Sequence, residues 1–144
     1  MRVDVSRVDI WSALIEDRPG AVAEKLDALA QSDIDLEFII SRRSHTKPGT
    51  GVVYVTPIKG PTRIKAAREA GFEIAKSLHE IRIATGNKPG YGSEVTMQMA
   101  DAGINLRSIS GASIGNRAVF YVAFDSDEDA NKAISVLERN YINQ

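Results

Sequence analysis

Apolar residues follow two different periods along this chain, and the periods alternate from one segment to the next. Within residues 34–43, every second position from Ile34 to Ile40 is apolar, and a period of two is typical of a β-strand. Within residues 20–32, the apolar residues recur every three or four positions, which places them on one stripe of a helix: Val22, Leu26 and Leu29.

The same analysis of the whole chain predicts the order strand, helix, strand, strand, helix, strand, followed by a second copy of it. A final strand has only Asn140–Gln144 available, so we expect it to be short or absent. Trp11, in the first predicted strand, alternates with its neighbours and is expected in the core. The predicted strands are 8–15, 34–43, 51–58, 72–77, 78–84, 104–110 and 117–124; the predicted helices are 20–32, 61–71, 90–102 and one from Ser126.

The second copy is visible in the residues themselves. The segment Asp17-Arg18-Pro19-Gly20 recurs 70 positions later as Asn87-Lys88-Pro89-Gly90, and Ile34-Asp35-Leu36 recurs at the same offset as Ile104-Asn105-Leu106. Internal repeats of this kind indicate duplicated structural units. We therefore divide the chain into modules 1–77 and 78–144. Because no Gly/Ser-rich or Pro-rich linker separates them, we expect the modules to pack rigidly.

A βαββαβ unit with Asp-x-Pro-Gly after its first strand and Ile-Asp or Ile-Asn before its second resembles an ACT domain. Here the pattern occurs at Asp17–Gly20 and again, with Asn in place of Asp, at Asn87–Gly90, and the resemblance extends from about residue 8 to 140. The resemblance implies an α+β fold of two ferredoxin-like modules packed side by side, with their antiparallel sheets joined into one eight-stranded sheet. It further implies a homodimer that binds a free amino acid, without catalysis, and regulates a partner enzyme or regulator protein.

The first turn between strand and helix is where the family binds its ligand, and elementary chemistry favours the same place. A helix N-terminus offers unpaired N–H groups and partial positive charge to a carboxylate, and glycine lets the ligand approach the backbone. A neighbouring Asp or Asn can bind the ammonium group. The predicted ligand-binding residues are Asp17, Pro19, Gly20, Ala21, Val22, Ile34, Asp35, Asn87, Pro89, Gly90, Tyr91, Gly92, Ile104 and Asn105.

The second copy departs from local rules at this turn, because Gly86, Gly90 and Gly92 exceed what a helix start needs. Such departures often mark functional sites, whereas the alternative is drift in a purely structural module. Ser108 and Ser110 leave a similar choice between a weakened edge strand and a polar pocket. The basic loop 42–51 is expected to be a solvated hairpin rather than a lid.

Composition excludes several other classes. The chain has no cysteine and a formal net charge of −1, so thiolate chemistry is absent and no bulk field attracts nucleic acid or a membrane. His45 and His79 are the only histidines and have no neighbouring motif, so we expect no catalytic residue, metal or cofactor. No targeting segment is recognisable, which makes the cytoplasm the expected location.

Three alternatives remain open at this stage. One is a protein-interaction module without ligand; separately, an apolar patch at Ile10 and Leu14 would indicate an oligomer contact. A small ferredoxin-like enzyme is another, since this fold has many functions. The third is an RRM-like RNA binder, because residues 117–124 match part of that motif, although they lack its glycine.

Overall fold

The computed structural model describes residues 3–142 and separates the chain into two compact units. One contains residues 9–75 and is called the inserted unit. The other, called the split unit, contains the N-terminal segment to residue 8 together with the chain from residue 76 onward. The chain therefore leaves the split unit once and returns to it once.

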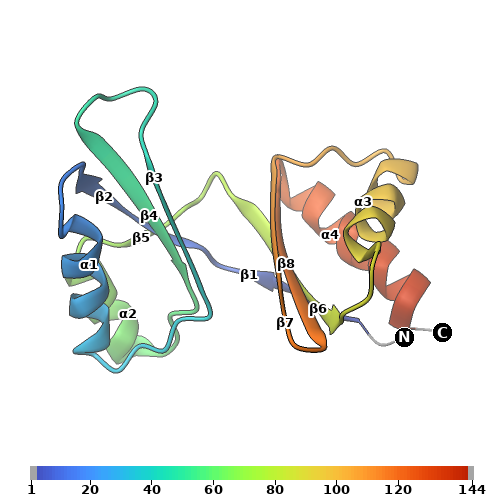
Figure 1. Ribbon diagram of the computed structural model, residues 1–144, viewed down its shortest axis with the longest axis horizontal. Coiled ribbons are helices and arrows are strands. Elements are labelled where there is room, and N and C mark those ends of the chain that lie inside the picture. Colours follow the sequence, from blue (N-terminus) through green and yellow to red (C-terminus); the bar gives the residue numbers. More distant parts are fainter. Residues whose placement is uncertain (1–2, 143–144) are drawn as a thin grey trace. The chain divides into compact units, whose positions relative to one another are not determined.

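The inserted unit is an antiparallel sheet in the order β3-β4-β2-β5 with two helices against one face (Figure 1). Its helices begin where the glycine and proline signals predict, at Ala21 after Gly20 and at Pro61 after Gly60. Its elements are β2 (Trp11–Glu16), α1 (Ala21–Ala30), β3 (Phe38–Arg43), β4 (Thr50–Thr56), α2 (Pro61–Glu69) and β5 (Glu73–Ile74).

The split unit repeats this architecture with the sheet order β1-β6-β8-β7 and helices α3 and α4 on one face (Figure 1). Ser126 caps α4, because its Oγ accepts a hydrogen bond of 3.1 Å from the Asp129 amide. The elements are β1 (Asp4–Val8), β6 (His79–Gly86), α3 (Tyr91–Asp101), β7 (Ser108–Ile114), β8 (Arg117–Phe124), α4 (Asp127–Leu137) and a π-helical segment, η1 (Glu138–Ile142).

The fourth strand of the split unit comes from the N-terminal end of the chain. After α4 the backbone continues as η1, so residues 138–142 contain no strand, and residues 143–144 lie outside the described residues. The edge position beside β6 is taken by β1, which pairs with it from Asp4↔Ala84 to Val8↔Glu80. The sequence did not predict this strand, and the proposed division at residues 77 and 78 places it in the other module.

The expectation of one eight-stranded sheet is wrong, because the structure contains two separate four-stranded sheets. A continuous sheet would need a ladder between an edge strand of one unit and an edge strand of the other. In residues 3–142 every ladder joins strands of the same unit. Although β1 and β2 nearly adjoin in sequence, Asp9 and Ile10 interrupt them and the two strands enter different sheets.

Each unit has its own apolar core between sheet and helices. In the inserted unit the core includes Trp11 and Phe72, and in the split unit Ile81 and Phe124. Trp11 is 2% exposed, which confirms its predicted place. The predicted stripe of the last helix is also confirmed, since Ala130 and Leu137 are fully buried and Ile134 packs against them.

A buried carboxyl group lies on the sheet face opposite the helices of the split unit. Glu80 is 6% exposed and pairs with Val8 of β1 and Ala123 of β8. Burial raises the pKa of Glu80 to about 7 because the charged form loses its hydration. The residue at the corresponding position of the inserted unit, 70 places earlier, is Ile10, which is also buried.

Glu80 should make folding stability depend on pH. Its folded-state pKa exceeds the unfolded value of 4.5, so the folded state binds more protons between these values and stability falls as the pH rises from 4.5 to 7. The loss is at most about 3.5 kcal/mol, at about 1.4 kcal/mol per pKa unit. Glu80→Gln should flatten this slope and raise the unfolding free energy at pH 8, measured by urea titration. Glu73→Gln, an exposed site on β5, is the control, and an unchanged slope in Glu80→Gln would contradict the assignment.

Candidate functional site

The turn between β2 and α1 depends on one glycine in a left-handed conformation. Gly20 has φ 86° and ψ −9°, and its carbonyl accepts the Glu24 amide at 3.0 Å to start the helix. A residue with a Cβ is strained at such a φ, whereas glycine is not. No side chain caps this helix.

The turn between β6 and α3 has nearly the same backbone. Gly90 has φ 91° and ψ −1°, and its carbonyl accepts the Glu94 amide at 2.9 Å. Both turns are also fastened to the hairpin that follows: the Asp17 amide donates to Gly49 O at 3.0 Å, and the Asn87 amide donates to Asn116 O at 2.8 Å. The repeated glycine therefore has a structural reason in both units.

A basic residue in each turn binds a glutamate in the first turn of the following helix. Arg18 Nη2 lies 2.7 Å from Glu24, and Lys88 Nζ lies 3.2 Å from Glu94. Both pairs repeat at the offset of 70, so this signal is present in the sequence, outside the defining residues of the ACT-like motif. Hydrogen bonds from Arg18 hold the pKa of Glu24 below its usual value.

The two turns differ in the charges that surround them. In the first, Arg18 Nε also binds Glu16 at 2.8 Å and Asp17 is paired with Arg43 at 2.7 Å. A Cβ placed on Gly20 would lie 3.9 Å from Arg18 Nη1. The first turn is thus surrounded by side chains already engaged with one another.

The second turn is more open and carries fewer charges. A Cβ on Gly90 would meet no atom within 4 Å. Asn87 replaces Asp17, and its side chain makes no hydrogen bond within residues 3–142. Lys88 lies over the ring of buried Tyr91, 4.8 Å from its centroid, where cation–π attraction helps to hold it.

The ring of Phe120 lies close to two glycines of the split unit, Gly111 and Gly92. A Cβ on Gly111 of β7 would lie 2.8 Å from Phe120 Cδ1, whereas a Cβ on Gly92 of α3 would lie at an ordinary 3.7 Å from Cε1. Phe120 pairs with Ile83 of β6, and the residue that pairs with the equivalent Ala13 of β2 in the inserted unit is the smaller Val53. Gly111 is therefore required by the ring, but Gly92 is not.

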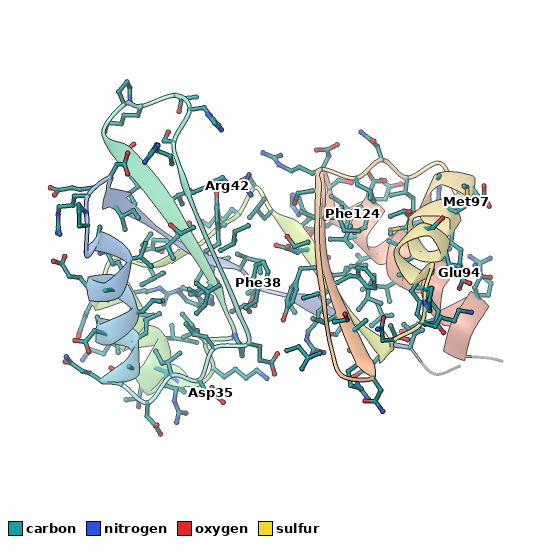
Figure 2. The ribbon with its side chains drawn as sticks, viewed as in Figure 1. Asp35, Phe38, Arg42, Glu94, Met97 and Phe124 are labelled. Atoms are coloured by element: carbon teal, nitrogen blue, oxygen red, sulfur yellow. The ribbon has the colours of Figure 1, made fainter. Side chains whose placement is uncertain are left out.

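The structure does not bring all predicted ligand-binding residues together. Ala21 and Val22 lie in the first turn of α1, but Ile34 and Asp35 follow its opposite end. A helix of ten residues is about 15 Å long, so the residues before and after α1 are far apart. Asp35 lies at one end of the inserted unit, away from Arg42 of β3 (Figure 2). Ile104 and Asn105 follow the C-terminal end of α3 in the same way, and Ile34 and Ile104 are buried core residues.

The two histidines singled out in the sequence lie in different units. His45 lies in the exposed hairpin loop between β3 and β4, while His79 is bound to Asp127 in the split unit. Within residues 3–142, no three His, Cys, Asp or Glu side chains are grouped so that they could hold a metal ion. No helix in this part of the chain is long and apolar enough to cross a membrane.

Comparison with known proteins identifies the fold. No protein-family model and no curated protein matches the chain. Protein BT0572 from Bacteroides thetaiotaomicron is similar in structure, with a TM-score of 0.78 and 17% identity over 94% of this chain and 90% of that one. The ligand-free regulatory subunit of aspartate kinase from Thermus thermophilus gives a TM-score of 0.62 and 18% identity, with 95% of each chain covered.

A longer enzyme shows the same relationship over part of its length. E. coli aspartokinase III, in complex with aspartate and ADP, gives a TM-score of 0.57 and 16% identity over 97% of this chain but 33% of its own. The chain therefore shares the two-unit fold of aspartate kinase regulatory subunits, as the ACT resemblance predicted.

The contact between Phe120 and Gly111 predicts opposite effects for two glycine substitutions. Gly111→Ala should lower the unfolding free energy by about 1–3 kcal/mol, because the added methyl group overpacks the ring. Gly92→Ala should raise it by up to about 1 kcal/mol, because alanine favours the helix and finds room there. Denaturant titration measures both, and Phe120→Val should relieve the penalty of Gly111→Ala. A penalty that persists in that background would show that the ring is not its cause.

Proposed function

We propose that this protein binds a free amino acid at the turn Asn87–Gly92 and acts as a regulatory protein without catalysis of its own. The observation that carries the proposal is that fewer ion pairs surround the uncapped start of α3 than surround the start of α1. The first turn has the same backbone, but paired charges of its own surround it. The second turn is therefore the better place for a charged ligand.

The two charged groups of an α-amino acid match what this turn offers. The first amides of α3 and the helix dipole would favour the carboxylate at Gly90 and Gly92. The side-chain oxygen of Asn87 would accept a hydrogen bond from the ammonium group. Pro89 fixes the local backbone, and Tyr91 lies buried beneath Lys88 at the start of the helix.

The family resemblance extends the proposal to a homodimer, since ligands of that family lie between paired modules. Ile39 of β3 and Ile109 of β7 support it: they lie on edge strands, 70 positions apart, and are 48% and 43% exposed. Exposed apolar residues at equivalent positions fit an interface that both units can form. The regulated partner would be an enzyme or a regulator protein.

A thermal-shift screen of the twenty amino acids at millimolar concentration tests the proposal, with nucleotides as controls. A ligand that binds only the folded state at 100 times its Kd stabilises it by about 2.7 kcal/mol, so one amino acid should raise the Tm by several degrees. Gly90→Ala should abolish the shift. Gly20→Ala imposes a similar backbone strain at the first turn and should leave the shift intact.

The outcomes separate the proposed function from its alternatives. A shift that survives Gly90→Ala but is lost in Gly20→Ala would move the ligand to the first turn. If no amino acid shifts the Tm, the protein is better explained as an interaction module without ligand. The exposed Leu14, at 74%, and the edge-strand isoleucines would then be the residues to investigate.

A further inference from the structure

One carboxylate in the split unit binds side chains from two strands. Asp127, the first residue of α4, accepts hydrogen bonds at Oδ1 from Arg7 Nη2 at 2.7 Å and from His79 Nδ1 at 2.9 Å. Arg7 Nη1 also donates to Asn131 Oδ1, one turn further along α4, at 3.1 Å. The group of Arg7, His79, Asp127 and Asn131 is called the crossing clamp below.

The clamp lies at both points where the chain passes between the units. Arg7 is the penultimate residue of β1, after which the chain enters the inserted unit at residue 9. His79 is the first residue of β6, just after the chain has returned at residue 76. Asp127 therefore ties the last residues before the inserted unit to the first strand after it.

Within the inserted unit, hydrogen bonds also fix the first and last residues of its chain segment. Thr56 Oγ1 donates to Asp9 O at 2.9 Å, and the Ala75 amide donates to Ile10 O at 2.8 Å. Between Arg7 of the clamp and Asp9 of the inserted unit, the outgoing connection contains one residue, Val8. The returning connection has Lys76, Ser77 and Leu78, of which Lys76 and Ser77 are exposed.

The clamp matters because β1 is an edge strand of five residues that pairs only with β6. A single exposed ion pair contributes little to stability, but here one carboxylate binds two donors and Arg7 binds a second acceptor. Hydrogen bonds from Arg7 and His79 hold the pKa of Asp127 below its usual value, so the carboxylate stays ionised. An acidic residue at a helix start is also favoured by the dipole alone, and Glu128 and Asp129 share that property.

We propose that Asp127 is a conformational clamp, which locks the end of β1 and the start of β6 to α4. The role goes beyond amino-acid binding and does not depend on it. Loss of this carboxylate would then let the end of β1 fray from β6 more often.

Hydrogen exchange of the full chain, followed by mass spectrometry, tests the clamp. Asp127→Ala should speed exchange in peptides covering residues 4–9 and 79–82 about fivefold, because the strand end opens locally more often. Glu128→Ala is the matched control: it removes an exposed charge from the same helix turn, and exchange in those peptides should stay as in the unmodified chain. Peptides of β8 should be unaffected in both variants.

A double substitution separates a clamp from a simple helix-charge effect. Arg7→Ala should reproduce the local increase, and Arg7→Ala with Asp127→Ala should add less than the sum of the two, because both remove the same contact. Equal exchange in Asp127→Ala and Glu128→Ala would overturn the proposal. So would an increase spread evenly over β8 and α3, or strictly additive effects of Arg7→Ala and Asp127→Ala.

Discussion

The ladder between β1 and β6 is the constraint on which the rest of the molecule depends. It makes the split unit a four-stranded sheet, and it covers the core with Val3 and Val5 from the start of the chain. Because β1 precedes the inserted unit and β6 follows it, this core closes only when two segments about 70 residues apart pair. Such a long-range contact has a loop-closure cost that local hairpins avoid. The hydrogen bonds of Arg7 to Asp127 and Asn131 add side-chain contacts to this strand of five residues.

Duplication accounts for much of what the two units share. The left-handed glycines 20 and 90, the basic residue two places before each and the glutamate four places after all keep the offset of 70. The left-handed position where each helix ends is shared too, at Asp33 with φ 57° and Gly103 with φ 76°. These are backbone requirements of one βα unit, so they say nothing by themselves about ligand.

Features with a local cause could be predicted from the sequence. Helix starts at Gly20, Gly60 and Gly90, the cap at Ser126 and the burial of Trp11 all follow from a few neighbouring residues. The strand β1 could not, since Asp-Val-Ser-Arg-Val is short and gains its place only by pairing with a distant β6. The prediction of one joined sheet was wrong for a related reason. Strand alternation predicts which residues share a face of a sheet, but not which edge strands pair with each other. The candidate site was placed at the turns by motif, but the motif also included Asp35 and Asn105, which follow the far ends of the helices.

Two glycines of the split unit, Gly90 and Gly111, have structural reasons. Gly111 is explained by the ring of Phe120, and Gly90 by the same backbone geometry that Gly20 has. Neither of these two glycines requires a ligand, so the functional argument does not rest on them. What distinguishes the second turn is chemical: Asn87 replaces an aspartate that is paired with Arg43, and Lys88 binds one glutamate where Arg18 binds two. A turn with fewer internal ion pairs loses fewer of them when a charged ligand binds. This difference favours the turn Asn87–Gly92 over the turn Asp17–Gly20.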